Sequence, residues 1–294
     1  MIKHRILCAI ICCVCILMSG CSTQNHQDPT FGHTDPTLGS TDVADEEVVS
    51  ATYLSYASAF EAEYKMDNGT LFGRGKNSLG LFGENTSDIY EEWVQITDIT
   101  DIVHVEAVGT TIMFLTETGC VYILGWPEGL FSEGENKSVI SSPMLVSEDC
   151  VYASLGIRFL LLLKSDHTLW FLGESKNGQS TKTEACVSVP TQIAKDILLI
   201  KAFGYTTAWV DSTYSLYMCG DNSYGQIGNG HQGTGFPTLY EDIVSTPYLA
   251  LKNCIKITTP DETSVLDTSI LAETVDGSTY AWGGKYGNVP QRID

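Results

Sequence analysis

The chain has 294 residues, 43% of them hydrophobic and 27 of them glycine, which is typical of a folded globular protein rather than a disordered acidic tail. Its 16 basic residues stand against 36 acidic ones, giving a formal net charge of −20 at pH 7. Neutralising phosphates requires clustered lysine and arginine, so this balance argues against direct binding of DNA or RNA.

The first 20 residues are predicted to be an export signal. A basic start at Lys3 and Arg5 precedes an apolar run over 6–17, which is too short for a membrane span of about 20 residues. The next four residues, MSGC, resemble the cleavage box of bacterial lipoproteins, although Met18 stands where that pattern prefers leucine. The resemblance implies cleavage before Cys21, acylation of its thiol, and an exported protein anchored to the outer face of the cell membrane. The alternative is an ordinary signal peptide in which Cys21 is incidental.

The segment after this cysteine is predicted to be a tether. Residues 22–50 contain six acids, no lysine or arginine, and many Gly, Pro, Ser and Thr residues. Such a segment repels itself and buries little apolar surface. We therefore expect a flexible acidic tether over 21–50 and a folded domain over 51–294.

The folded part carries an internal repeat, which decides the fold class. An aromatic residue usually precedes a glycine by three positions, and these glycines are spaced by 50, 48, 47 and 63 residues. Turn signals precede most copies, and short apolar runs such as 112–115 and 159–163 indicate buried strands. A second glycine follows each first glycine after four or five residues. The first glycines are Gly75, Gly125, Gly173, Gly220 and Gly283.

A third recurring feature follows each glycine turn. Segments 93–96, 143–146, 190–193, 237–240 and 290–293 share a similar pattern, and the last four begin with proline. Proline is tolerated at the first residue of a strand, where no ladder donor is needed. The pattern therefore predicts that Pro143, Pro190, Pro237 and Pro290 each begin a strand.

One copy of the repeat is specific enough to indicate a family. The segment LYMCGDNSYGQIGNG, at 216–230, resembles the repeat of the regulator of chromosome condensation family. The matching residues are Gly220, Asn222, Gly225, Gln226 and Gly228. The resemblance covers about 51–294 and implies an all-β propeller in which each repeat forms a four-stranded blade.

The number of blades does not follow from the family, because its eukaryotic members have seven and this chain has five copies of the repeat. The first copy lacks a clear beginning, and segment 289–293 has no glycine segment after it. We therefore expect the C-terminal strand to join the first blade and close a five-bladed ring. An open ring, or one completed by a dimer, is the alternative.

Few residues suggest metal or cofactor chemistry. Five cysteines remain in the folded part, mostly in apolar runs where a thiol acts as a small hydrophobe. There is no CxxC pair and no metal-type spacing of the six histidines, so we expect no metal and no cofactor. Whether any of the thiols pair is open. They are Cys120, Cys150, Cys186, Cys219 and Cys254.

Catalysis is the less favoured interpretation. Some five-bladed propellers are glycosidases that use a pair of carboxylates at the axis. Candidate acids here are Asp211, Asp221, Asp267 and Glu273, but an acid in a chain with 36 of them is usually a solvated surface group. We expect no catalytic residues and no enzymatic activity.

Aromatic residues beside the glycine turns are the favoured candidates for function. Large rigid side chains at blade ends can act as anchors for a partner protein, although each can also simply pack. They are Trp126, Tyr205, Tyr224, Phe236 and Tyr286.

These observations predict a lipid-anchored, monomeric, non-catalytic propeller that binds a protein with a basic face. Three alternatives remain. The protein could be a carbohydrate-binding or glycoside-processing propeller, a propeller similar to a bacterial β-lactamase inhibitor, or a surface scaffold without a dedicated ligand.

Overall fold

The computed structural model describes residues 56–59, 61–77, 80–83, 87–127, 129–131, 139–182, 184–233, 242–260 and 268–294. The predicted signal, Cys21, the tether, Asp267 and Phe236 lie outside these ranges. No helix within the described ranges is long and apolar enough to cross a membrane.

Twenty strands in this part of the chain form five four-stranded antiparallel sheets, which confirms the all-β prediction. Each sheet uses four consecutive strands, and neighbours in a sheet follow chain order. The first and second sheets are β1 (Tyr56–Ala59), β2 (Ala62–Asp67), β3 (Thr70–Lys76) and β4 (Ile89–Gln95), then β5 (Ile102–Val108), β6 (Thr111–Thr116), β7 (Val121–Gly125) and β8 (Ile140–Ser147). The third and fourth are β9 (Cys150–Gly156), β10 (Phe159–Lys164), β11 (Leu169–Glu174) and β12 (Cys186–Ala194), then β13 (Ile197–Phe203), β14 (Thr206–Asp211), β15 (Leu216–Asp221) and β16 (Ile243–Leu251). The fifth is β17 (Cys254–Thr258), β18 (Ile270–Thr274), β19 (Thr279–Trp282) and β20 (Gln291–Arg292), with a short 3-10 helix, η3 (Gly284–Tyr286), between the last two.

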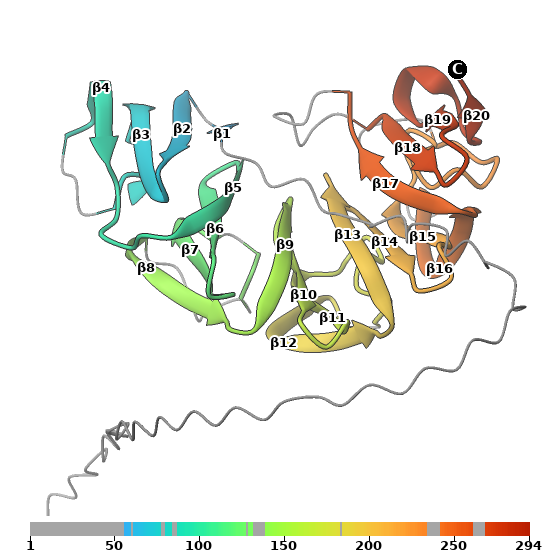
Figure 1. Ribbon diagram of the computed structural model, residues 1–294, viewed down its shortest axis with the longest axis horizontal. Helices are drawn as coiled ribbons and strands as arrows, with labels where there is room; N and C mark the ends of the chain where they lie inside the picture. Colours follow the sequence, from blue (N-terminus) through green and yellow to red (C-terminus); the bar gives the residue numbers. More distant parts are fainter. Residues whose placement is uncertain are drawn as a thin grey trace, which may run out of the picture. The chain divides into compact units, whose positions relative to one another are not determined.

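The first strands of successive sheets lie beside one another (Figure 1). β1 contacts β5, β5 contacts β9, β9 contacts β13, and β13 contacts β17. The core lies between sheets, in hydrophobic clusters each shared by two consecutive sheets. An amphipathic four-stranded sheet cannot bury its apolar residues alone, so each sheet depends on its neighbours.

The pairing register repeats from sheet to sheet. The residue two positions before each first glycine pairs with the second strand on one side and the fourth strand on the other. This register defines equivalent residues on the five first strands. In chain order they are Ala57, Glu106, Ser154, Lys201 and Thr258, which pair with Tyr64, Met113, Leu161, Ala208 and Leu271.

The two recurring glycines have different structural roles, as Gly173 and Gly225 illustrate. Gly173 has a φ of 124°, and a Cβ there would lie 2.4 Å from the carbonyl oxygen of Arg158 in its own sheet. Gly225 has a φ of 78°, and a Cβ there would lie 2.8 Å from Cβ of Asn288 in the next sheet. Other residues are strained at such φ values. The first glycine therefore allows close approach of the backbone within its own sheet. The second allows consecutive sheets to approach each other.

The expected positions of the prolines are partly wrong. Pro143 and Pro190 lie inside β8 and β12, at irregularities of the pairing, rather than at the beginning of these strands. In β16 the equivalent residue is Pro247, whereas Pro237 is outside the described residues. β8, β12 and β16 are the last strands of their sheets, and a bulge on an edge strand tolerates a residue without an N–H donor. Trp93 occupies this position in β4.

The expected closure by the C-terminal strand is wrong. β20 pairs with β19 in the fifth sheet, and the first sheet is complete with its own β1 and β2. No described strand pairs the first sheet with the fifth. The sequence pattern hid β2 because Glu63 and Lys65 alternate with its buried residues, so the first repeat lacked a recognisable apolar run.

The five cysteines of the folded part are all free thiols. Cys219 and Cys254 are buried, and burial raises the pKa of both thiols. They behave as hydrophobic side chains, as expected from their apolar surroundings.

Candidate protein-recognition surface

Antiparallel strands give each sheet two distinct ends. The turns between first and second strands and the loops between third and fourth strands share one end, called the loop end here. The turns between second and third strands and the connections between sheets share the other, called the turn end. Trp126, Tyr205, Tyr224 and Tyr286 all lie at the loop end and are partly buried.

Two of these aromatic residues are brought together by contacts between the loops of the fourth and fifth sheets. The N–H of Gly284 donates to the carbonyl oxygen of Tyr224 at 2.9 Å, and Gly284 begins the helix η3 that contains Tyr286. A second backbone bond, from Gly230 to the carbonyl of Asn288, is also 2.9 Å long. These two backbone bonds join the loops that carry the two tyrosines.

The other two aromatic residues are held separately. The N–H of Trp126 donates to the carbonyl of Thr110 at 2.7 Å within the second sheet. Tyr205 is in the turn between β13 and β14, and its carbonyl accepts a bond of 3.2 Å from Asp221 N–H. The structure places these four residues at sheet ends, and backbone bonds join the loops of Tyr224 and Tyr286; their role in binding stays a prediction.

The most specific residues of the repeat are structural. Asn222 Oδ1 accepts a bond of 3.0 Å from the N–H of Ile227, and its Nδ2 donates to the carbonyl of His231 at 3.1 Å. Gln226 Oε1 accepts from the N–H of Tyr224, and the Gln226 carbonyl accepts from Trp282 Nε1 at 2.8 Å. Asn222 and Gln226 therefore shape the loop and attach it to the next sheet.

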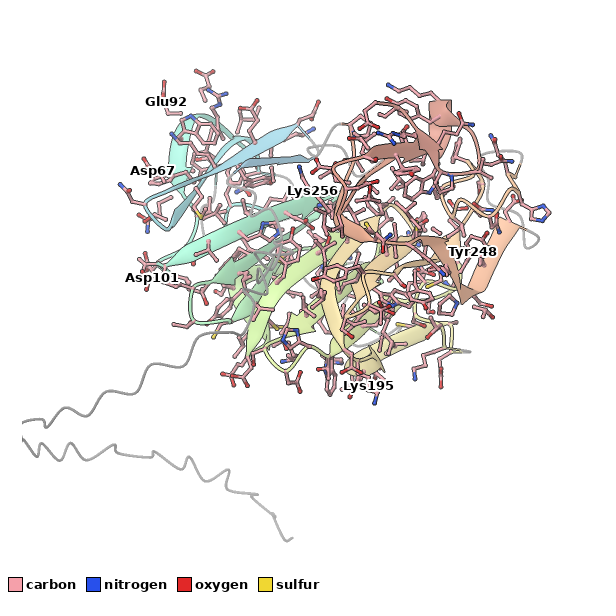
Figure 2. All side chains as sticks on the ribbon, turned by 45° about the vertical axis from the view of Figure 1, so that its right-hand side comes forward. Asp67, Glu92, Asp101, Lys195, Tyr248 and Lys256 are labelled. Carbon is pink, nitrogen blue, oxygen red and sulfur yellow. The ribbon has the colours of Figure 1, made fainter. Side chains whose placement is uncertain are left out.

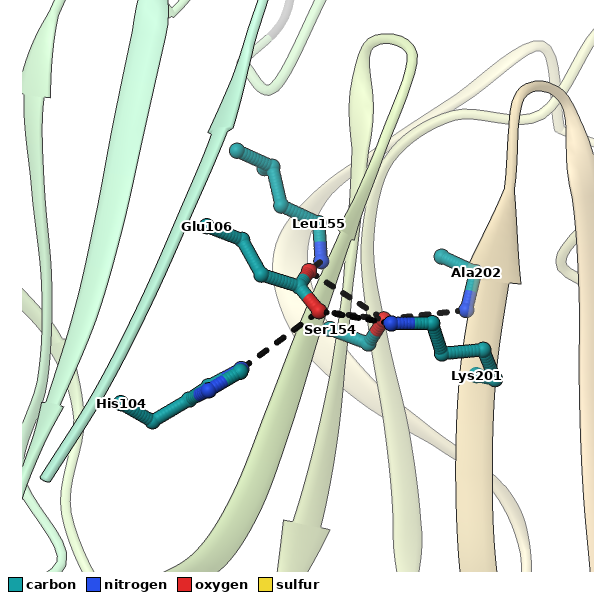
Figure 3. Close-up of polar contacts among 6 residues, drawn as sticks. All are labelled: His104, Glu106, Ser154, Leu155, Lys201 and Ala202. Atoms are coloured by element: carbon teal, nitrogen blue, oxygen red, sulfur yellow. Dashed lines mark hydrogen bonds and ion pairs between the residues drawn. The ribbon is translucent and has the colours of Figure 1, made fainter. Parts of the chain in front are cut away.

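A cluster of polar residues that the sequence analysis missed connects the first strands of three sheets (Figure 3). Glu106 of β5 accepts hydrogen bonds from the N–H of Leu155 at 2.5 Å and from Ser154 Oγ at 3.3 Å, both on β9. It also accepts from Lys201 Nζ of β13 at 3.1 Å. Ser154 Oγ in turn accepts from Ala202 N–H at 3.0 Å. We call Glu106, Ser154 and Lys201, with His104 beside them, the axial cluster.

Glu106 is ionised in this environment. Burial by itself would raise its pKa, but Lys201, His104 and the N–H of Leu155 together lower it to about 2. His104 Nε2 lies 3.4 Å from Glu106 Oε1, and its ring stacks on Tyr152 at 4.8 Å. The charged groups are therefore neutralised within the cluster, as burial requires.

The axial cluster contains the residue types of a nucleophile triad but not its geometry. In such a triad, histidine lies between serine and the carboxylate so that it can take the hydroxyl proton. Here Glu106 contacts both Ser154 and His104, and Ser154 and His104 are both buried. The cluster is placed to join sheets rather than to activate a nucleophile.

The sequence did contain a signal for the axial cluster. Glu106, Ser154 and Lys201 are spaced by 48 and 47 residues, the same spacings that separate Gly125, Gly173 and Gly220. Equivalent positions of a repeat share a place in the fold, so these three side chains had to meet wherever the first strands meet.

The carboxylates considered for glycoside chemistry are dispersed. Asp211 is at the turn end and accepts from Thr213 and Ser215, whereas Asp221 is buried at the loop end and accepts from Ser223. Glu273 is on β18 and pairs with Lys256 at 2.8 Å. These three acids form no pair around a common space, and no group of metal-binding side chains occurs among the described residues.

Acidic residues gather at the turn end. Side-chain hydrogen bonds from Thr168 and Thr274 are the largest causes that lower the pKa values of Asp166 and Asp276. Figure 2 labels three charged residues of this end, Asp67, Asp101 and Lys195. The described acids of these turns and connections are Asp67, Asp98, Asp101, Glu117, Glu148, Asp149, Asp166, Asp196, Asp211 and Asp276, against Lys164, Lys195 and Lys252.

Comparison with known proteins identifies the fold. No protein-family model and no curated protein sequence matches the chain. Human WBSCR16 superposes with a TM-score of 0.62 and 20% identity, covering 80% of this chain and 65% of that one. Prp20p of Saccharomyces cerevisiae gives a TM-score of 0.64 and 15% identity, covering 81% and 64%. Yeast RCC1 (Prp20) in complex with Kap60 gives 0.62 and 18%, covering 81% and 60%.

The chain therefore spans less than two thirds of the length of these solved structures. At such low identity the likeness concerns the fold alone. Together with the five repeating antiparallel sheets, it shows that this chain has an RCC1-like β-propeller fold.

Proposed function

We propose that this protein is a non-catalytic interaction module that binds another protein at the loop end. The observation that carries the proposal is the backbone hydrogen bonding between the two loops that carry Tyr224 and Tyr286 at this end. Tyrosine offers a large contact area at low entropic cost, and anchors fixed before binding lose little freedom on association. Lys285 Nζ lies 5.0 Å from the centre of the Tyr286 ring and adds a cation to this surface.

The similar structures favour a protein ligand over a small molecule. The structure of Prp20p is described together with its binding to Gsp1p and histones, and yeast RCC1 (Prp20) has been solved with Kap60. For this chain we expect a different partner with a basic face, because its net charge is −20. A net charge of this sign attracts a basic partner and raises its association rate.

The proposed location is the outer face of the cell membrane. Acyl chains on Cys21 would anchor the protein, and the acidic segment 21–50 would hold the propeller away from the lipid. Incorporation of labelled fatty acid tests this proposal: the full chain should be labelled and Cys21→Ala should not. Equal labelling of both would contradict the anchor.

Binding is tested by capture from the producing cell with a matched control. The full chain and a Tyr224→Ala/Tyr286→Ala variant are cross-linked on living cells and purified. The control is Tyr248→Ala, because Tyr248 is 39% exposed but lies on the outer strand β16 rather than at the loop end.

We expect one protein to be captured by the wild type and by Tyr248→Ala, and lost with the double variant. Equal capture by all three proteins would show that the loop-end tyrosines do not contribute to binding. Recovery of glycan without protein would favour a carbohydrate-binding propeller.

A further inference from the structure

The first sheet differs from the others on the face where a preceding sheet would pack. Four equivalent positions form this face in every sheet. In the second and third sheets all four are apolar and belong to the cores shared with the preceding sheet. They are Ile112, Phe114, Tyr122 and Leu124 in the second sheet, and Leu160, Leu162, Trp170 and Leu172 in the third.

In the first sheet, three of these four positions are charged. The residues are Glu63, Lys65, Phe72 and Arg74. Two of these charges pair: Arg74 Nε donates to Glu63 at 3.2 Å, and the side chains of Arg74 and Glu63 are 43% and 40% exposed. Water therefore reaches this ion pair.

Trp93 completes this face of the first sheet. Lys65 Nζ and Arg74 Cζ each lie 4.7 Å from the centre of its ring. Trp93 occupies the bulge position that proline holds in β8, β12 and β16. Cations stacked on an aromatic ring cover its apolar surface while keeping their charges in water. Side chains of the first sheet therefore cover the apolar surface of Trp93 without a neighbouring sheet.

The fifth sheet shows a smaller change on its opposite face, where one of four equivalent positions is charged and Ala281 is still buried. The positions that face a following sheet are Met113, Leu115, Val121 and Ile123 in the second sheet. In the fifth sheet they are Leu271, Glu273, Thr279 and Ala281. Glu273 pairs with Lys256 at 2.8 Å, with side-chain exposures of 44% and 42%.

In the other sheets, certain glycines lie against the following sheet. The equivalent glycines of the fifth sheet have no such contact among the described residues. A Cβ on Gly119, at the turn end of the second sheet, would lie 2.9 Å from the carbonyl of Cys150 in the third sheet. The equivalent Gly277 meets nothing within 4 Å among the described residues. At the loop end Gly225 abuts Asn288, whereas within the described ranges a Cβ on Gly287 would meet only Gln291 of its own sheet, at 3.7 Å.

We infer that the first and fifth sheets are the solvent-facing caps of an open array, and that the propeller does not close by packing one on the other. Closure would remove Glu63, Lys65, Arg74, Lys256 and Glu273 from water, and the desolvation of charges opposes it. Linear repeat proteins use polar terminal repeats in the same way to stay soluble.

Labelling of lysines in the native full chain tests the caps. The side chain of Lys256 is 42% exposed. Lys176, at 56%, and Lys201, at 13%, serve as references for fast and slow reaction with the reagent. With a limiting amine-reactive reagent and mass spectrometry, Lys65 and Lys256 should react several-fold faster than Lys201. Rates for both as slow as that of Lys201 would show a closed ring and overturn the inference.

A variant gives the converse test. Glu63→Ile, Lys65→Phe and Arg74→Leu together give the first sheet the residues of the second. We expect this variant to self-associate in sedimentation experiments while the wild type stays monomeric. A wild type that forms dimers in which Lys65 is protected would also overturn the inference, and this measurement does not depend on the variant folding.

Discussion

The axial cluster and the outer face of the first sheet use similar groups in opposite environments. Glu106 and Lys201 are 7% and 13% exposed and join three sheets, whereas Glu63 and Arg74 are 40% and 43% exposed and belong to one sheet. A buried ion pair cannot lose one partner without leaving a charge in a medium of low dielectric constant. An exposed pair exchanges its partner for water at little cost. The same chemistry therefore connects sheets at the axis and ends the array at its edge.

The largest effect is expected from removing the axial cation. Lys201→Met leaves Glu106 buried without its main counter-charge, so the free energy of unfolding should fall by about 3–5 kcal/mol. Urea titration at pH 7 measures this change. Lys256→Met is the matched control, because its pair with Glu273 is exposed, and should cost less than about 1 kcal/mol. Similar losses for both lysines would contradict the distinction.

A second effect concerns pH. The pKa of Glu106 is lowered from 4.5 to about 2 in the folded protein, so folding favours its ionised form. Its stabilising contribution is complete above the unfolded-state pKa and is lost as the pH falls from about 4.5 toward 2. The stability difference between wild type and Glu106→Gln should therefore be large at pH 7 and shrink over that range. A difference independent of pH would mean that Glu106 is not ionised at neutral pH.

The sequence predicted the sheets better than their connections. The glycine spacing revealed the repeat because a positive φ and close approach of the backbone exclude most other residues. Pro237 follows Pro190 by 47 residues and so fits the repeat spacing, but it is Pro247 that lies in β16. The loop after Gly220 is longer than in the earlier repeats, and spacing alone cannot tell which proline enters the strand.

The axial cluster and the cap were missed for a related reason. A glutamate in a strand is usually a surface residue, and only the register of neighbouring sheets places Glu106 inside and Glu63 outside. The neighbouring glycines mark the sheet ends, so the sequence places Trp126, Tyr205, Tyr224 and Tyr286 there, while their role in binding stays a prediction. The hydrogen bonds that join the loops of Tyr224 and Tyr286 lie between sheets, and no local pattern encodes them.

A smaller effect distinguishes a glycine that contacts the next sheet from a glycine of similar φ that contacts none among the described residues. Gly225→Ala and Gly277→Ala place alanine at nearly the same φ, 78° and 79°, and share a strain of about 1–2 kcal/mol. Only the first also meets the backbone of Asn288, at 2.9 Å from its Cα. We expect Gly225→Ala to cost about 1–3 kcal/mol more than Gly277→Ala, because overpacking adds to the strain. Equal losses in urea titrations would indicate that a sheet also packs against Gly277.

The smallest effect is expected at the cap and tests its exposure most directly. Glu63→Gln keeps the shape of the side chain and removes only its charge, while Lys65 and Arg74 still contact the ring of Trp93. The free energy of unfolding should change by less than about 1 kcal/mol, and the change should shrink further in 1 M salt because exposed pairs are screened. Urea titrations at low and high salt measure both quantities. A loss above about 2 kcal/mol that resists salt would place Glu63 in a desolvated interface, as Glu106 is, and the first sheet would then have a packed neighbour rather than a cap.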